Sequence, residues 1–195
     1  MFEGISEYII NCMLKEQVIK QEDIDIYRFG LHQMLILSLN IITTIAIGVL
    51  FRQPIEALLF VFFFSALRKY AGGFHASTVL RCYLLTTTVL AVTLWIIRYV
   101  DISCFSYMTI YLFASVIVLI LAPLGTSERS LDAIETIIYR KRYIIMWIME
   151  MICFTLGYTL KIHCLYTSIT IAQMVLMISL LAEYLLQYYR LHNNK

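Results

Sequence analysis

At positions 67–82 the chain reads Leu67-Arg68-Lys69-Tyr70-Ala71-Gly72-Gly73-Phe74-His75-Ala76-Ser77-Thr78-Val79-Leu80-Arg81-Cys82. This stretch combines a candidate nucleophile (Cys82), a candidate base (His75), two adjacent glycines and three cations. The sequence on either side of it is almost continuously apolar. Reactive side chains at the edge of a membrane-like sequence predict an enzyme that meets its substrate at the membrane surface.

The composition is that of an integral membrane protein. The chain has 195 residues, of which 61% are hydrophobic and 14% charged, and its mean hydropathy is +0.81. Soluble domains have about 45–50% apolar and about 25% charged residues. A soluble core of this size cannot bury so much apolar surface, so lipid must cover the excess. The net charge of +2 does not indicate a nucleic-acid partner.

The predicted fold class is an all-α, polytopic integral membrane protein with about six transmembrane helices, and 1–195 forms one domain. The expected spans within 30–195 are 30–51, 55–68, 79–99, 103–122, 143–160 and 164–189, with a polar loop over 124–142. Residues 1–29 alternate charged and apolar side chains at helical spacing, which predicts an amphipathic helix. This helix either lies on the membrane surface or docks on the rest of the protein, and the sequence leaves both alternatives open.

Cations are concentrated on one side of this predicted topology. Twelve Lys and Arg side chains fall in the N-terminal segment, the 68–81 region, the 124–142 loop and the C-terminal tail. The opposite side has three, which are Arg52, Arg98 and Lys161. The positive-inside rule therefore predicts that both termini, His75 and Cys82 lie on the cytoplasmic side. The cytoplasm is reducing, so a free thiol at Cys82 would persist there.

The spacing of His75 and Cys82 sets a condition on the backbone between them. On one straight helix they would lie about 10 Å apart, which is too far for direct proton transfer. If they act as a base and a nucleophile, the chain from Gly72 to Ser77 must therefore be non-helical. Gly72-Gly73 favours such a break, and Ser77 or Thr78 is a suitable N-cap for a helix that contains Cys82. Positive charge at a helix N-terminus and at Arg81 would stabilise a thiolate.

From spacing alone, an isolated His near an isolated Cys is more often structural than catalytic. The other four cysteines are scattered, form no CxxC pair, and are interpreted mainly as small apolar side chains. Three other classes therefore stay open: a small transporter or exporter of peptide, a non-catalytic assembly or sensor protein, and a lipid-modifying membrane enzyme. No motif indicates a metal site, a nucleotide or another cofactor.

The run from Arg68 to Ala76, followed by Cys82, resembles the signature of the accessory gene regulator B family. These are bacterial membrane endopeptidases that process quorum-sensing propeptides. The chain length, the multiple spans and Ala122-Pro123 at the end of an apolar run are also similar to that family. The resemblance implies that His75 and Cys82 are catalytic and that Arg68 and Gly73 support them. One departure is Glu128-Arg129-Ser130-Leu131, where members often have Asn-Lys-Pro-Leu.

The resemblance also implies a mechanism and a partner in the bacterial cell membrane. Cys82 would cleave a small amphipathic propeptide and keep its N-terminal part as a thioester, and an internal Cys or Ser would then close a thiolactone or lactone ring. The acidic part of the propeptide would be attracted by cations, for which the candidates are Lys69, Arg81, Arg129, Arg140, Lys141 and Arg142. Glu150 and Glu183 fall inside expected spans, where they could line a cavity or a helix interface, including that of a homodimer.

Overall fold

The computed structural model describes residues 3–73, 78–100, 102–125 and 132–193. Within them every regular element is helical, and the one β-bridge joins Gly72 to Leu124. The predicted all-α class is therefore confirmed. The elements are α1 (Glu3–Lys15), the short 3-10 helix η1 (Gln21–Asp23), α2 (Ile24–Leu50), α3 (Pro54–Ala71), α4 (Val79–Tyr99), α5 (Cys104–Leu121), α6 (Ala133–Thr159) and α7 (His163–Asn193).

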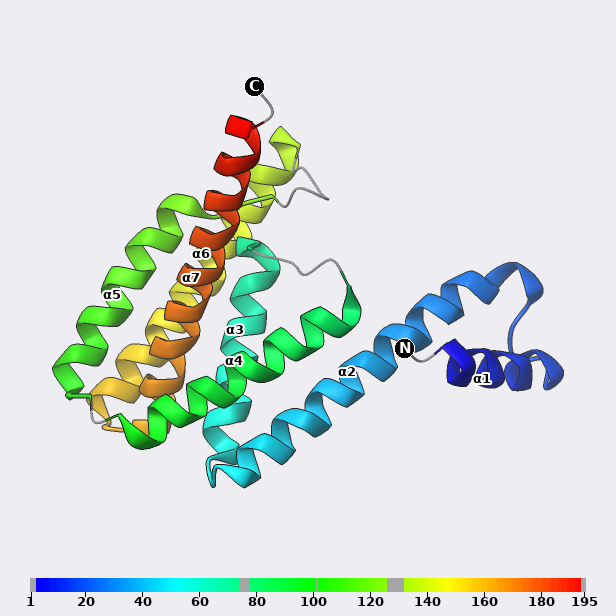
Figure 1. Cartoon of the computed structure of the whole chain (residues 1–195), viewed down its shortest axis with the longest axis horizontal. Helices are drawn as coiled ribbons and strands as arrows, with labels where there is room; N and C mark the ends of the chain where they lie inside the picture. Colours follow the sequence, from blue (N-terminus) through cyan, green and yellow to red (C-terminus); the bar gives the residue numbers. More distant parts are fainter. Residues whose placement is uncertain (1–2, 74–77, 101, 126–131, 194–195) are drawn as a thin grey trace.

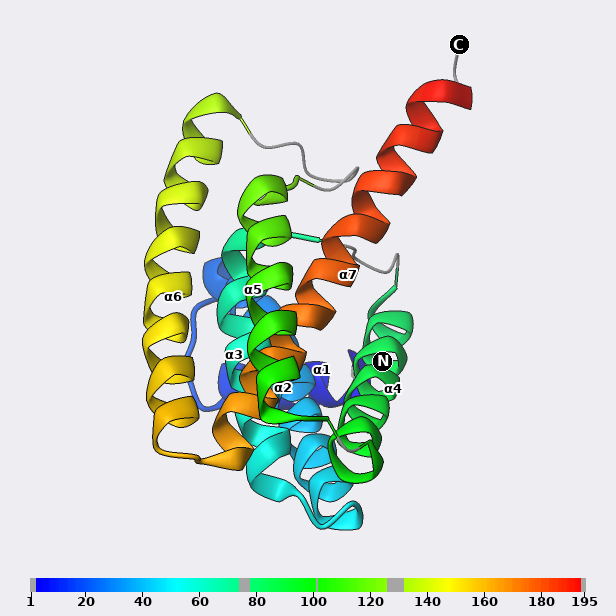
Figure 2. The ribbon, with the colours of Figure 1, turned by 90° about the vertical axis from the view of Figure 1, so that its left-hand side faces the viewer.

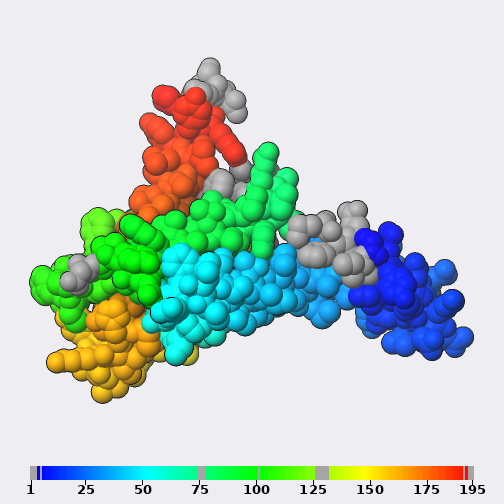
Figure 3. All heavy atoms as spheres, turned by 60° about the horizontal axis from the view of Figure 1, so that its bottom comes forward, coloured from blue at the N-terminus to red at the C-terminus, as the bar shows by residue number. Residues whose placement is uncertain are grey.

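Four helices form a bundle, and the others lie against or beyond it. In Figure 1, α3, α5, α6 and α7 run side by side, while α2 and α4 cross them at an incline. Figure 2 shows α5 between α6 and α7 in the view from the side. α1 packs on the far part of α2, and together they project from the bundle as an arm, which is clear in Figure 3.

The centre of the bundle is α7. Every residue from 166 to 173 is buried, and Leu176 and Leu180 continue the buried surface toward the C-terminus. A helix that is covered on all sides must be surrounded by others, and α7 contacts α3, α4, α5 and α6. α3 is covered along one side, where its buried residues are Ala57, Phe60, Phe63, Phe64, Leu67 and Ala71. The bundle is thus organised around α7.

The outer surface is apolar, as expected for a protein in lipid. Among the described residues, four segments are long and apolar enough to cross a membrane: Gln21–Leu50, Val79–Tyr99, Cys104–Leu121 and His163–Arg190. α3 and α6 are not among them: α3 has three charged residues in its 18 residues, and α6 has five charged residues, four of them in its first ten positions. The outer side of α6 is nevertheless apolar, with exposed side chains at Ile134, Ile137, Ile138, Ile144, Ile145, Ile148, Met149 and Ile152.

Several predicted boundaries agree with the helices, and two are wrong. The 79–99 span coincides with α4, and the 103–122 span differs from α5 by one residue at each end. The 124–142 loop was expected to be polar and irregular, but α6 begins at Ala133. Asp132 and Glu135 form a capping box there, in which the Asp132 backbone N–H donates to Glu135 Oε2 at 3.4 Å.

The second correction concerns the N-terminal segment 1–29, which is not one helix. α1 ends at Lys15, Gln17 adopts a left-handed φ of 55°, and α2 begins at Ile24 rather than near residue 30. α1 packs against α2, with Ser6 and Ile10 buried. Within the described residues α1 is thus in contact with α2, and a position on the membrane surface stays a prediction.

The ends of the bundle separate the cations near the C-terminal ends of α3 and α7 and the start of α6 from Arg52, Arg98 and Lys161, while the N-terminal cations lie in the α1–α2 arm. In Figure 1, the C-terminal ends of α3, α5 and α7 and the start of α6 lie at one end of the bundle. The α2–α3, α4–α5 and α6–α7 connections lie at the other end. Arg98 Nη1 donates to the Phe51 carbonyl oxygen at 3.0 Å, which ties two of these three connections together.

Candidate active site

The α3 helix ends in a backbone turn that only glycine fits. Gly72 and Gly73 have φ values of 82° and 114°, which L side chains rarely adopt. A Cβ atom on Gly72 would collide with the carbonyl oxygen of Leu124, and one on Gly73 would lie 2.8 Å from Ser179 Oγ. The predicted helix break at Gly72-Gly73 is therefore present, and it packs tightly against two other parts of the chain.

Cys82 lies in the first turn of α4. Thr78 is the N-cap, as the sequence predicted for Ser77 or Thr78, and its hydroxyl accepts a bond from the Arg81 N–H at 3.3 Å. The Cys82 N–H makes the first regular helical bond, to the Thr78 carbonyl oxygen at 3.0 Å. The half-buried Cys82 side chain thus lies near the positive end of the α4 dipole.

Arg68, on the last turn of α3, lies within electrostatic range of Cys82. Its guanidinium is close enough to Cys82 for the two charges to interact when the thiol is ionised. The Arg68 Cζ atom also lies 5.4 Å from the centre of the Phe64 ring, which supports the cation over an apolar surface. Arg68 and Cys82 are fourteen residues apart in sequence, and the α3–α4 turn brings them together.

A cavity of about 420 Å³ extends from Arg68 between α3, α4 and the segment after α5. It adjoins a smaller one of about 50 Å³ that reaches Val89, Val175 and Ser179. Cys82 lies on the same face of α4 as Thr86 and Val89, at helical spacings of four and seven. The walls are mainly apolar and aromatic with cations at the rim; those of the larger cavity are Phe60, Val61, Phe64, Ser65, Arg68, Lys69, Tyr70, Gly72, Thr86, Pro123, Leu124, Gly125 and Tyr139.

Residues 122–125 close one side of this cavity and are held by three elements. The Leu124 N–H donates to the Ala71 carbonyl oxygen at 2.9 Å. Gln187 Nε2 on α7 donates to the Gly125 carbonyl oxygen at 2.6 Å, and Arg140 Nη1 on α6 donates to that of Ala122 at 3.4 Å. The sequence did not single out Gln187 or Ser179, because nothing in a one-dimensional pattern shows which polar residue of α7 meets a distant loop.

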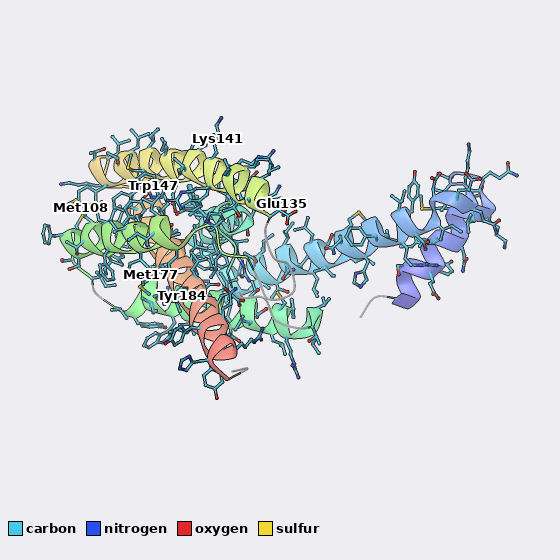
Figure 4. The ribbon with its side chains drawn as sticks, turned by 90° about the horizontal axis from the view of Figure 1, so that it is seen from above. Met108, Glu135, Lys141, Trp147, Met177 and Tyr184 are labelled. Atoms are coloured by element: carbon cyan, nitrogen blue, oxygen red, sulfur yellow. The ribbon has the colours of Figure 1, made fainter. Side chains whose placement is uncertain are left out.

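The cations predicted to attract the substrate lie in different surroundings. Arg140 binds the α5 end, since its Nη2 also lies 3.5 Å from the Leu119 carbonyl oxygen. Lys141 is exposed and points away from the bundle in Figure 4, and Lys69 is exposed with its Nζ atom 5.7 Å from the centre of the Tyr70 ring. Arg81 and Arg142 are also exposed. His75 and Arg129 lie outside the described residues.

We predict that Gly73→Ala destabilises the protein for two separable reasons. The left-handed φ costs about 1–3 kcal/mol for a residue with a side chain, and the contact with Ser179 adds to this. Adding Ser179→Ala removes the nearest atom, so the double variant should regain part of the lost thermal midpoint but not all of it. Gly30→Ala, with nothing within 4 Å of its Cβ position, is the control and should not lower the midpoint. Full recovery in the double variant would contradict the role of backbone strain.

We also predict that Arg140 and Lys141, adjacent in sequence, have different roles. Arg140→Gln should lower the free energy of unfolding by about 1–2 kcal/mol, because two carbonyl oxygens at the α5 end lose a charged donor. Lys141→Gln should change it by less than about 0.5 kcal/mol. Thermal unfolding in lipid nanodiscs measures both, and equal losses for the two variants would contradict this assignment.

Comparison with known proteins places the chain in a family. The family model described as Accessory gene regulator B matches residues 6–188. Two AgrB-like proteins of Clostridium perfringens, from strain SM101 / Type A and from strain 13 / Type A, are 35% and 34% identical to the chain over 85 residues. These matches cover 44% of the chain and 40% of each relative. No solved structure matches the chain.

Proposed function

The chain belongs to the accessory gene regulator B family, and from this membership we propose that it is a membrane-embedded cysteine endopeptidase for a quorum-sensing propeptide. The main structural support for this proposal is the position of Cys82. It lies in the first turn of α4, within electrostatic range of Arg68, on the helix face that borders a cavity of about 420 Å³. A positively polarised helix terminus and a guanidinium are the surroundings that favour a reactive thiolate.

In this proposal Cys82 attacks a peptide bond of the propeptide, and His75 first accepts the thiol proton and then gives a proton to the leaving amine. The C-terminal fragment departs, and the N-terminal part stays on Cys82 as a thioester. An internal Cys or Ser of the peptide then attacks the thioester carbonyl, which releases Cys82 and closes a thiolactone or lactone ring. The apolar cavity walls favour ring closure over hydrolysis, because they limit the water near the thioester.

The cavity offers a binding place for the propeptide segment next to the cut. Its aromatic walls suit a bulky apolar side chain, and Arg68 and Lys69 at its rim suit a carboxylate. Lys141 and Arg142 are exposed, so they could attract an acidic segment over a longer range. The proposed partner is thus an amphipathic peptide with acidic residues, met at the membrane surface.

The proposed placement in the membrane has six crossings, by α2 to α7. α3 and α6 carry most of their charges near the end of the bundle that contains Arg68 and Arg140, which lets their remaining lengths lie in lipid. That end would face the cytoplasm of a bacterial cell, as the cation distribution favours.

The orientation has a direct test. In a variant with all five cysteines replaced, we expect a single cysteine at Asp132 to resist membrane-impermeant thiol reagents in intact cells. A single cysteine at Lys161, at the opposite end of the bundle, should be labelled. Both residues are exposed, so access depends on the side of the membrane and not on burial. Labelling of the Asp132 variant alone would reverse the proposed orientation.

The proposed chemistry predicts how each variant changes cleavage activity and the reactivity of the Cys82 thiol. Cys82→Ala should abolish cleavage, and Cys82→Ser should leave at most a trace, because a hydroxyl is far less acidic than a thiol. Arg68→Gln and His75→Ala should both slow alkylation of Cys82 by iodoacetamide near neutral pH, since each removes a group that favours the thiolate. Cys153→Ala, on α6, is the control and should retain activity.

A propeptide whose ring-forming Cys or Ser is changed to Ala isolates the intermediate. It should leave a covalent adduct on Cys82 that hydroxylamine releases. Cleavage by the Cys82→Ala variant would exclude the proposed nucleophile. If the peptide is exported but never cut, the transporter class would be favoured.

A further inference from the structure

A group of buried oxygen atoms lies in the core between α5, α6 and α7. Its members are Tyr111 and Ser115 on α5, Tyr143 and Glu150 on α6, and Gln173 on α7, each at most 2% exposed. None of them lines either cavity beside Arg68. The proposed peptidase chemistry therefore does not use this group.

Most of these oxygen atoms have no hydrogen-bond partner among the described residues. They are the hydroxyl oxygens of Tyr111 and Tyr143, both carboxyl oxygens of Glu150, and Gln173 Oε1. The Gln173 amide nitrogen is already used, since Nε2 donates to Ser115 Oγ at 3.3 Å. The group thus offers five unpaired oxygen atoms. The unpaired buried nitrogen nearest to it in sequence is Trp147 Nε1, three residues before Glu150 on α6.

The unpaired atoms nevertheless lie near one another. Tyr111 is within interaction range of Ser115, Tyr143 and Glu150, and Tyr143 is within range of Gln173 and Glu150. Tyr111 lies beside Ser115 and Tyr143 beside Gln173, while both carboxyl oxygens of Glu150 have no partner. Oxygen atoms gathered around an unpartnered carboxylate have the arrangement of ligands around a guest. Three helices contribute to this arrangement, so a guest would connect them.

The charge of Glu150 indicates what the guest is. No Lys, Arg or His side chain is buried among the described residues, so no protein cation balances this carboxylate. An unpaired carboxylate within a membrane protein core is strongly unfavourable. The described residues also contain no group of three or more His, Cys, Asp or Glu side chains that could hold a transition metal. One carboxylate with neutral oxygen ligands matches a single positive charge, whereas a divalent ion would leave net charge in the core.

We propose that Tyr111, Ser115, Tyr143, Glu150 and Gln173 form a binding site for one alkali-metal cation, Na⁺ or K⁺. The cation binds the Glu150 carboxylate and neutral oxygens from α5 and α7. It thereby ties together the helices that carry Arg140 and Gln187, which hold the segment beside Cys82. The site stabilises the bundle and does not depend on the proposed reaction.

The test is thermal unfolding of the full-length protein in phospholipid nanodiscs, in chloride salts of Na⁺, K⁺ or N-methylglucamine at equal ionic strength. Trp147, three residues before Glu150 on α6 (Figure 4), supplies a fluorescence signal close to the site. We expect the midpoint to rise with alkali-metal concentration and to saturate, by about 5–10 °C at about 100 times the Kd. Binding of radioactive sodium to the wild-type protein, displaced by unlabelled Na⁺, should show about one site per chain.

Variants test whether these five residues cause the cation dependence of the thermal midpoint. Glu150→Gln should abolish the cation dependence of the midpoint, and Tyr143→Phe should move it to higher cation concentration. Glu183→Gln is the matched control, because Glu183 is also buried but accepts a bond from Gln187 Nε2 at 3.1 Å, and it should keep the dependence. If Glu150→Gln does not fold, Tyr143→Phe and sodium binding decide the question.

An equal wild-type midpoint in all three salts, together with no sodium binding, would overturn the proposal. Glu150 would then carry a proton, or the group would hold only water. A cation dependence that persists in Glu150→Gln would also overturn it. Neither result would bear on cleavage by Cys82, which is measured separately.

Discussion

The packing of α7 against α3, α5 and α6 is the interaction on which the rest of the structure depends. Eight consecutive residues of α7, from 166 to 173, are buried, so this helix is covered on every side at its middle. In lipid, where apolar surface alone gives no preference for protein neighbours, such complete burial requires close packing and internal polar contacts. The small and polar side chains of this run, Thr167, Ser168, Thr170 and Gln173, provide both.

The same helix positions the candidate active site. Ser179 lies against Gly73, and two turns later Gln187 holds Gly125. The Gly72-Gly73 break is therefore fixed by α7 and by Leu124 and not only by the two helices it joins. The C-terminal end of α3, which carries Arg68, is therefore fixed in position, because the backbone at Gly72-Gly73 has little space in which to move.

The sequence predicted some parts of this arrangement well because their signals are local. Thr78 before an apolar run, Pro54 at a helix start and the glycine pair each determine backbone conformation within a few residues, so the bounds of α4 and the break before it were predictable. The first turns of α6 were missed, since Arg140, Lys141 and Arg142 were interpreted as marks of a loop. The capping box at Asp132 and Glu135 was the available signal.

Contacts between segments that are far apart in the chain could not be predicted from one sequence. Arg140 was grouped with Lys141 and Arg142 as a cation for the substrate, yet it binds carbonyl oxygens that α5 leaves unpaired at its end. A sequence shows that a charge is present but not which backbone groups lack partners near it. The same reasoning explains Glu150, whose burial depends on the approach of α5 and α7.

The two faces of α4 suggest how a membrane-surface peptide reaches the thiol. Cys82, Thr86 and Val89 share the face toward the cavities, whereas Leu80 and Leu84 are about half exposed on the opposite side. α4, which carries Cys82, thus has one face toward the cavities and an opposite apolar face that is exposed. If the chain cleaves an amphipathic peptide as proposed, the peptide could keep its apolar side in lipid and pass its reacting segment around the first turn of α4. This path would place the scissile bond at the positive helix terminus, where the developing negative charge of the attacked carbonyl would also be stabilised.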